Sequence, residues 1–254
     1  MDMDTWFSWY KTILKEFGFS KKDDEDSALI LSKLLEDKSV LSPQKINIKK
    51  NVVVFGAGPS IKRNIKELKK INVNNFTIIA ADGATTALLE ENIVPDIIIT
   101  DLDGKIDDIL TADKLGSLLV VHAHGDNQDK IEKYVPLIKN IMGSTQGTPL
   151  KNVYNFGGFT DGDRCVFLAI ELKARLIILA GMDFGNIVTN YSRPELGKSV
   201  DNADEIKKLK LDYAKRLIEW AAAHENVKIV NISHGDLLKG IRQVKVDEIN
   251  LIVE

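Results

Sequence analysis

Acidic side chains follow five successive apolar runs of this 254-residue chain. One aspartate at the end of a strand usually caps a helix or forms a turn. Five sets brought to one edge of a sheet would repel one another strongly unless a cation lay among them. The pattern therefore predicts a cation site built from carboxylates. In chain order the aspartates are Asp82, Asp101 with Asp103, Asp126, Asp161 with Asp163, and Asp183.

Asp101 and Asp103, in the segment TDLDG, form the sharpest pair. Residues i and i+2 of an extended segment point to one face, so both carboxylates are expected to face the same ligand. Mg²⁺ prefers oxygen ligands and typically takes one or two carboxylates together with substrate phosphates. The pair therefore favours Mg²⁺ bound with a nucleotide polyphosphate.

A glycine-rich turn, GAGPS at residues 56–60, follows the apolar run NVVVF. Such a turn brings backbone N–H groups and the start of a helix close to an anion. Pro59 and Ser60 suit the first helical turn, and Lys62 and Arg63 follow within reach of a phosphate. G-x-G-P is neither the complete dinucleotide fingerprint nor a P-loop, so a plain tight turn is an equal alternative.

The segment HAHGDN at residues 122–127 is similar to the H-x-H-x-D-H string of metallo-β-lactamase-like hydrolases, with Asn127 in place of the last histidine. A binuclear zinc site of that kind needs several imidazoles, and the chain has four histidines. Hydrogen bonding to phosphate or substrate is favoured for His122 and His124. Structural roles and metal ligation remain alternatives.

The other candidate nucleophiles and bases have plainer interpretations. His224 lies near the end of a helical pattern, and Cys165 lies in the apolar helical stretch RCVFLAIEL, so it is expected in the core. His234 follows an apolar run, but SHGD does not predict a catalytic triad. Neighbours in sequence rarely have triad geometry, and the chain has no G-x-S-x-G elbow.

Short apolar runs alternate with helical patterns from residue 51 onward. Continuously apolar runs are expected for strands covered on both faces, and repeated strand–helix units imply right-handed crossovers. We expect an α/β fold with a doubly wound, mostly parallel, Rossmann-like sheet whose ligands bind at the carboxyl ends of the strands. The predicted strands are 51–55, 76–81, 96–100, 118–121, 152–156, 175–180 and 227–232, and the predicted helices are 59–71, 84–92, 105–115, 127–141, 162–174 and 204–224.

The first 45 residues predict a small N-terminal helical region, ahead of an α/β domain at 46–254. Trp6, Trp9 and Ile13 recur at helical spacing up to Gly18, and the acidic KKDDEDS suits the start of a second helix that runs through residues 28–35. The aromatic first helix is a candidate contact for a homodimer. Residues 186–203 form one long irregular stretch, as lids and binding loops often do.

Composition narrows the classes of protein. A net charge of −3 argues against a general nucleic-acid binder, and one cysteine excludes an internal disulfide. There is no apolar run of membrane-spanning length, and the N-terminus does not look like a signal peptide. We expect a soluble, cytoplasmic protein that acts on small molecules.

Several motifs in order carry a resemblance to a known family. FGAGPS, ADGA, PDIIITDLDG, HAHGDN and GGFTDGDR, spread over about residues 45–240, resemble the archaeal-type 6-hydroxymethyl-7,8-dihydropterin diphosphokinases. The same order is similar to the thiamine pyrophosphokinase catalytic domain, but Ala84 and Gly104 depart from the DGG and DxDS of those enzymes. A related domain also occurs in flagellin-modification proteins.

The resemblance implies Mg²⁺-dependent transfer of diphosphate from ATP to a hydroxymethyl dihydropterin, with release of AMP, in methanopterin or folate-type cofactor synthesis. The alternatives are a thiamine or other alcohol diphosphokinase, a zinc-dependent hydrolase, and a nucleotide-binding accessory module without activity. The proton acceptor stays open among the aspartates. Arg193 and Lys198 on the long loop are further candidates to meet phosphate.

The implied site residues fall into four groups. The expected catalytic residues are Asp101, Asp103 and Asp126, and the expected metal ligands are these three with Asp82. Residues expected to bind ATP or its phosphates are Gly56, Gly58, Pro59, Ser60, Asp82, Gly83, His122, His124 and Arg164. Residues expected to bind the acceptor are Gly157, Gly158, Thr160, Asp161 and Asp183, with the TQGTP segment at 145–149 as a further candidate.

Overall fold

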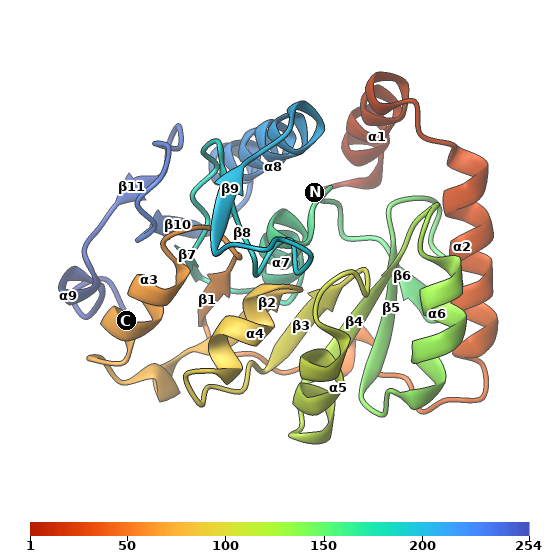
Figure 1. The fold of residues 1–254 in the computed structure, drawn as a ribbon, viewed down its shortest axis with the longest axis horizontal. Coiled ribbons are helices and arrows are strands. Elements are labelled where there is room, and N and C mark those ends of the chain that lie inside the picture. The colour runs from red at the N-terminus through yellow and green to blue at the C-terminus, as the bar shows by residue number, and fades with distance from the viewer. Residues whose placement is uncertain (254) are drawn as a thin grey trace.

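A nine-stranded sheet forms the centre of the computed structural model, which describes residues 1–253 (Figure 1). The strand order is β11-β10-β7-β1-β2-β3-β4-β5-β6, and every pairing between these neighbours is parallel. The expectation of a doubly wound, mostly parallel α/β fold is confirmed. The strands are β1 (Asn51–Phe55), β2 (Thr77–Ala81), β3 (Ile97–Thr100), β4 (Leu118–Ala123), β5 (Ile141–Thr145), β6 (Val153–Tyr154), β7 (Leu176–Ala180), β10 (Lys228–Asn231) and β11 (Arg242–Gln243).

Helices cover both faces of this sheet, because the central strands are apolar on both sides. One face packs against α2 (Lys21–Leu34), α3 (Ile61–Leu68), α4 (Ala84–Leu89), α5 (Ile106–Lys114), α6 (Gln128–Tyr134) and α9 (Val246–Ile249). The other face packs against α1 (Met3–Phe17), α7 (Asp161–Glu171) and α8 (Glu205–His224). Figure 1 shows α4 and α5 below the strands and α7 and α8 above them. Short 3₁₀ turns lie at Pro43–Lys45, Val73–Asn75 and Val135–Leu137.

The direction of winding reverses beside β1. From β1 the chain adds β2, β3, β4, β5 and β6 on one side, then crosses through α7 to place β7 on the other side of β1. In doubly wound sheets the crevice at this reversal point, outside the carboxyl ends of the strands, is where ligands bind. The fold therefore puts the turns after β1 and β7 next to each other at the expected position for a ligand.

The two N-terminal helices pack on opposite faces of the sheet. Helix α1 buries Trp6 and Ile13 in one core, and α2 buries Leu31 in the other. Helix α1 ends at Gly18, whose φ of 67° is a left-handed conformation that glycine adopts without steric cost. Helix α2 begins at Lys21, the first residue of the acidic segment predicted to start it, because the Ser20 hydroxyl caps it and the acidic side chains sit in its first turn.

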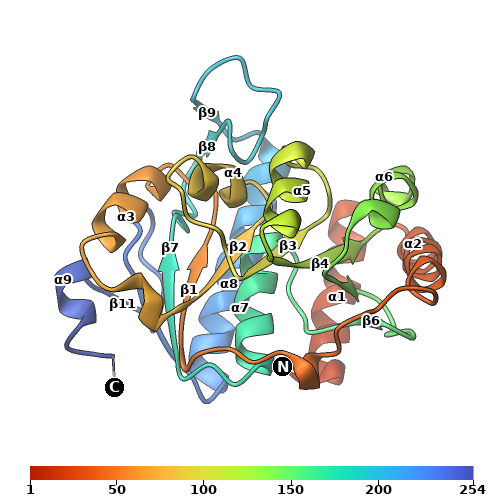
Figure 2. The ribbon, with the colours of Figure 1, turned by 90° about the horizontal axis from the view of Figure 1, so that it is seen from below.

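Two stretches differ from the sequence-based expectation. The helix predicted at 127–141 ends at Tyr134, and β5 follows at Ile141–Thr145, since Pro136 cannot continue the helix. The sequence of β5, IMGST, is too polar to be recognised as a buried strand. The long stretch at 186–203 contains an antiparallel hairpin, β8 (Ile187–Thr189) with β9 (Val200–Asn202), which lies beyond the carboxyl ends of the central strands (Figure 2). Within residues 1–253, no helix is long and apolar enough to cross a membrane.

Candidate active site

A cavity of about 610 Å³ opens at the carboxyl ends of the strands. The turns after β1, β2, β3, β4 and β7 all reach it, together with the start of α7. Its remaining walls come from the α1–α2 turn, the β8–β9 hairpin and one face of α8. The cavity therefore lies where the sheet topology predicts a ligand.

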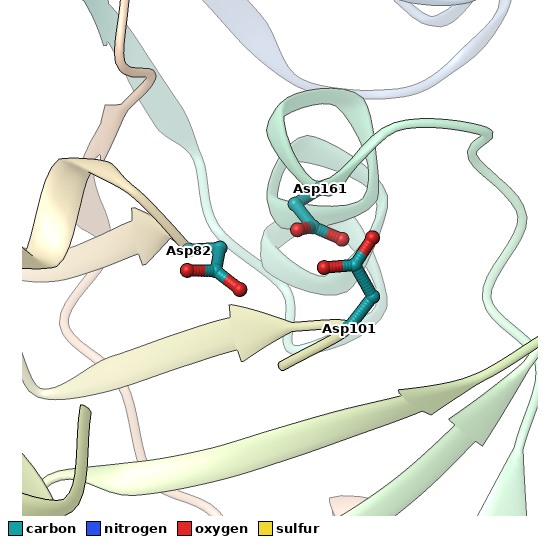
Figure 3. Close-up of side chains that lie close together, drawn as sticks. All are labelled: Asp82, Asp101 and Asp161. Atoms are coloured by element: carbon teal, nitrogen blue, oxygen red, sulfur yellow. The ribbon is translucent and has the colours of Figure 1, made fainter. Parts of the chain in front are cut away.

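Three carboxylates converge on this cavity, those of Asp82, Asp101 and Asp161 (Figure 3). Asp82 follows β2, Asp101 follows β3, and Asp161 is the first residue of α7. One oxygen from each lies within 4.8 Å of the other two. Sequence analysis grouped Asp82 and Asp101 as metal ligands but placed Asp161 with the acceptor-binding residues. The structure brings Asp161 into the carboxylate group.

Burial makes it unfavourable for all three carboxylates to be charged when no cation lies among them. Burial raises the pKa of Asp82 to about 7, with the charge of Asp101 adding to the effect. Burial also raises the pKa of Asp161 well above its usual range, again with Asp101 contributing. The Oδ2 atom of Asp82 accepts a 2.6 Å hydrogen bond from Thr100, whereas its buried Oδ1 atom has no partner among the described residues. A Cβ on residue 104 would lie 1.7 Å from that Oδ1 atom. Any side chain at this position would therefore displace the Asp82 carboxylate, and glycine leaves it where it is.

An oxygen-only donor set suits a hard cation such as Mg²⁺. Mg²⁺ takes carboxylate oxygens directly, and it would supply the partner that the buried Asp82 Oδ1 atom lacks. Zinc prefers nitrogen and sulfur ligands, and the group found among the described residues holds neither histidine nor cysteine. The residues present therefore fit Mg²⁺ and do not fit a histidine-lined zinc cage.

His124 lies between two of the aspartates. Its Nε2 atom is 3.4 Å from Asp101 Oδ2, and its Nδ1 atom is 2.6 Å from Asp126 Oδ1. Burial lowers the pKa of His124, but the hydrogen bonds to Asp101 and Asp126 outweigh burial and raise it to about 9. Burial likewise acts to raise the pKa of Asp101, but the hydrogen bond and charge of His124 bring it down to about 2. As an imidazolium, His124 has no lone pair to offer a metal.

Asp103 and Asp126, the other two expected metal ligands, are directed elsewhere. The backbone of Leu102 has a φ of 64°, which breaks the extended geometry assumed for the Asp101–Asp103 pair. Asp103 forms an ion pair with Lys130, and the side chain of Asp126 is 88% exposed. Both residues still line the cavity, at its rim.

Asn127 stands where the zinc-type motif would have a histidine, and it is buried. Its Nδ2 atom donates to the carbonyl oxygens of Asp101 at 3.0 Å and His122 at 2.7 Å, and its Oδ1 atom accepts from the N–H of His124 at 3.1 Å. The amide thus joins the ends of β3 and β4. It sets the positions of Asp101 and His124 through their backbones.

His122 does not reach the cavity wall. Its ring is buried within the sheet, where Nδ1 lies 3.0 Å from the Ser144 hydroxyl and Nε2 has no partner among the described residues. Burial lowers its pKa well below the usual range, with the charge of Arg164 adding to the effect. The ring centroids of His122 and His124 are 6.0 Å apart. In this arrangement the neutral His122 has a structural role, and the direct contact with phosphate or substrate that we expected from the sequence is not favoured.

The glycine-rich turn after β1 does line the cavity, but the first turn of α3 already holds an anion. Asp183 Oδ2 accepts 3.0 Å hydrogen bonds from both the backbone N–H and the hydroxyl of Ser60, and Oδ1 accepts from the N–H of His234. A Cβ on residue 58 would lie 2.3 Å from Asp183 Oδ2. Gly56, Gly58 and Pro59 are therefore placed to contact a ligand through van der Waals surface rather than by cradling a phosphate.

The segment before α7 divides into structural and cavity-facing parts. Gly157 and Gly158 have φ values of 84° and 93° and lie outside the cavity wall. Thr160 and Arg164 line the cavity, as does Gly83 after β2. Arg164 is buried, and it donates to Asp161 at 3.1 Å and to Gln146 Oε1 at 3.2 Å.

His224 and Cys165 take structural positions, whereas the side chain of His234 is exposed and lies outside the cavity wall. His224 Nδ1 lies 2.8 Å from the carbonyl oxygen of Trp220 within α8. Cys165 is fully buried in the core beneath α7, and burial raises its pKa well above the usual range. SHGD does not form a catalytic triad, since Ser233 is fully buried with its hydroxyl accepting from the N–H of Met182, and Asp236 pairs with Lys215.

Two lysines of α8 were missed by sequence reasoning. Lys207 and Lys210 line the cavity, whereas Arg193 and Lys198 are not on its wall and pair with Asp204 and Asp201. Burial lowers the pKa of Lys207, with the charge of Lys210 acting in the same direction. Within the lysine-rich KKLKLDYAKR, sequence alone does not separate these two from their neighbours. Lys207 and Lys210 are distinguished only by lying on the face of α8 that is turned toward the cavity.

Carboxylates and cationic side chains around a cavity at the carboxyl edge of a doubly wound sheet place the chain among the α/β proteins that bind a ligand at this edge. Within that class the family is clear. A family model described as 6-hydroxymethylpterin diphosphokinase MptE-like matches residues 30–189, and the chain belongs to that family of enzymes.

Curated relatives support the same assignment. The chain is 49% identical over 230 residues to the 6-hydroxymethyl-7,8-dihydropterin pyrophosphokinase of Methanothermobacter thermautotrophicus, covering 90% of this chain and 99% of the relative. It is 51% identical over 231 residues to the protein of the same name from Methanocaldococcus jannaschii, covering 87% and 95%. The family resemblance predicted from the motifs is confirmed.

A solved structure matches the fold. The Maf glycosyltransferase from Magnetospirillum magneticum AMB-1 superposes with a TM-score of 0.61 and 17% identity. The match covers 90% of this chain and 39% of the glycosyltransferase chain. At this identity the likeness is one of fold alone.

Proposed function

We propose that the protein transfers the terminal diphosphoryl group of ATP to the hydroxymethyl oxygen of 6-hydroxymethyl-7,8-dihydropterin, giving the pterin diphosphate and AMP. The observation that carries this proposal is the group of three carboxylates in the cavity of a chain that belongs to the pterin diphosphokinase family. The product would serve the synthesis of a methanopterin or folate-type cofactor. ATP as donor is in keeping with a reaction in the cytoplasm.

Asp82, Asp101 and Asp161 would hold Mg²⁺ in this proposal. Bound there, Mg²⁺ would supply neutralisation of charge on the phosphates, which is a main requirement of phosphoryl transfer. Asp103 and Asp126 take the rim of the same site, where they balance Lys130 and His124. They influence the rate through these basic partners rather than as direct ligands.

The nucleoside is assigned to the crevice between the turns after β1 and β7. Gly56, Gly58 and Pro59 line this end of the cavity, and the β8–β9 hairpin covers the same end with Ile187 and Tyr191. This placement directs the phosphates toward the carboxylate group. The pterin hydroxyl attacks the β-phosphorus and gives its proton to one of the cavity aspartates. The bond from that phosphorus to the α–β bridging oxygen breaks, and AMP leaves with this oxygen.

Basic side chains around the carboxylates complete the charge balance. Lys207, on the cavity face of α8, and Arg164, beside Asp161, are placed to meet the negative oxygens of the transferred group. Positioning of the reactants and neutralisation of charge are the principal contributions that a protein makes to such a reaction.

The direct test incubates the purified protein with ATP, Mg²⁺ and 6-hydroxymethyl-7,8-dihydropterin and measures AMP and pterin diphosphate. The proposal expects the two products in equal amounts, with loss of both on chelation and recovery with Mg²⁺. AMP formed only with thiamine or another alcohol would reassign the acceptor. Recovery with zinc but not Mg²⁺ would favour a hydrolase, and ATP binding without AMP would indicate an accessory module.

A further inference from the structure

The cavity has two ends that differ in chemistry, with the three carboxylates between them. One end lies beneath the β8–β9 hairpin and is formed by glycine backbone and apolar side chains such as Ile187. The other lies beneath the α1–α2 turn, where Phe19, Asp23 and Phe159 line the wall. A reaction between two substrates at the carboxylates needs one on each side of them, so each end takes a different substrate.

The α1–α2 end offers a partly free aromatic surface. The Phe19 side chain is 40% exposed and lines the cavity, although it is large and apolar. It stacks on Phe17 with ring centroids 5.2 Å apart and an interplanar angle of 20°, and Phe159 lies 6.5 Å away, centroid to centroid. Flat heterocycles stack favourably on such rings. Phe17 covers part of the Phe19 ring, and the Lys210 ammonium lies 5.8 Å from its centroid, so a ring that stacks on Phe19 would also lie beside this cation.

Two adjacent aspartates in the first turn of α2 have opposite roles. Asp24 is buried, and its oxygens accept from Tyr10, the N–H of Gly125 at 2.8 Å and Gln146 at 2.8 Å. This network ties the turn to the segment after β4. Asp23 is exposed on the cavity wall, and its carboxylate has no hydrogen bond or ion pair among the residues that the structure describes. The turn is therefore held firmly while one carboxylate stays available.

A free carboxylate beside an aromatic face matches one substrate better than the other. The pyrimidine edge of a pterin carries a 2-amino group and a ring N–H side by side, which together donate to the two oxygens of a carboxylate. Adenine presents one donor beside an acceptor on its corresponding edge. At the opposite end, Asp183 is already occupied by Ser60 and His234.

We infer that the α1–α2 turn forms the acceptor subsite, in which the dihydropterin ring stacks against Phe19 and Phe159 and donates from its 2-amino and ring N–H groups to Asp23. This inference rests on the proposed function and names the residues that select the acceptor. The hydroxymethyl group then points toward the carboxylates, and the nucleoside occupies the hairpin end.

Steady-state kinetics with each substrate varied in turn separates the two ends. Phe19→Ala and Asp23→Asn are expected to raise KM for the dihydropterin at least about fivefold, the low end of what loss of base stacking or of a charged hydrogen bond costs, with KM for ATP within about twofold. Phe19→Tyr keeps the ring and is expected to restore KM. Leu29→Ala and Asp26→Asn, on exposed parts of α2 outside the cavity wall, are matched controls without effect.

An analogue tests the Asp23 contact itself. Replacing the 2-amino group of the substrate by oxygen removes one donor, so the wild-type protein should discriminate against it and Asp23→Asn should discriminate less. Unchanged KM for the pterin in both variants, or a rise in KM for ATP instead, would overturn the subsite. A wild-type protein that neither binds the dihydropterin in calorimetry nor forms AMP with it refutes the proposed function first. If the wild-type protein turns over the dihydropterin but Phe19→Ala and Asp23→Asn leave its KM unchanged, only the subsite is refuted.

Discussion

The side-chain amide of Asn127 donates a 3.0 Å hydrogen bond to the main-chain oxygen of Asp101. The same nitrogen also donates to His122, so a single buried amide fixes the distance between the ends of two neighbouring strands. Asn127→Ala is expected to lower the free energy of unfolding by about 2 kcal/mol, because it leaves buried carbonyl groups without donors. It is also expected to weaken Mg²⁺ binding, because Asp101 is released.

Thermal unfolding and Mg²⁺ titration of the rate check both parts of this prediction. Asn140→Ala is a matched control, because the Asn140 side-chain amide donates to the main-chain oxygen of Asp113, away from the cavity. If Asn127→Ala lost stability but kept the Mg²⁺ dependence of the wild type, the amide would have only a structural role.

Asp161 should matter more to catalysis than Asp103. Asp161→Asn and Asp101→Asn remove one of three converging carboxylates and are expected to lower kcat by about 10²-fold or more, as loss of a key electrostatic group does. Asp103→Asn breaks a pair with Lys130 at the rim and is expected to cost less than about tenfold, since exposed ion pairs contribute little. Rates at saturating Mg²⁺ decide the ranking. If Asp103→Asn and Asp161→Asn lowered kcat equally, Asp103 would have to be counted among the metal ligands.

Lys207→Gln should separate a functional lysine from a surface one. The ammonium of Lys207 lines the cavity, and a charged hydrogen bond to phosphate is worth about 10- to 100-fold in kcat/KM. Lys208, the next residue of α8, pairs with Glu205 at the surface and provides the control. The expected result is loss of kcat/KM for ATP in Lys207→Gln with wild-type values in Lys208→Gln. Similar kinetics in both variants would remove Lys207 from the site.

The stability of the metal-free protein should fall as pH rises through the range in which His124 titrates. The folded-state pKa of about 9 lies above the usual value of 6.5, so the folded state holds this proton more tightly than the unfolded chain. The resulting stabilisation is fully present below pH 6.5 and is lost as pH approaches 9. Thermal unfolding across this range should show the decline, and His124→Gln should flatten it. If His124→Gln lost stability with rising pH as steeply as the wild type, the decline would not come from His124.

The fold could be read from the sequence because each strand is a continuous apolar run between helical patterns. The exception, β5, shows the limit. Its Gly143, Ser144 and Thr145 are small and polar, and they are buried only because neighbouring strands and α2 enclose them. A hydrophobic pattern identifies a strand whose own side chains are apolar. It does not identify a strand of small or polar residues that is buried by its neighbours.

The site was only partly predictable for a related reason. Asp82 and Asp101 follow strands directly, so the topology places them at the cavity. Asp103 required the extended geometry to continue, and the left-handed Leu102 ended it. Lys207 and Phe19 come from elements that approach the cavity through tertiary packing, which the spacing of residues along the chain does not report.

The outermost strands, β6 and β11, have two residues each. Beside β6, Val40 forms a bridge to Ile141 and covers part of β5 that β6 leaves open. Long unpaired edges serve as templates for strands of other chains, and very short edge strands are one way in which proteins avoid this. A second copy therefore finds little backbone at either edge onto which the sheet could extend. Short edge strands therefore protect both ends of the nine-stranded sheet from edge-to-edge pairing.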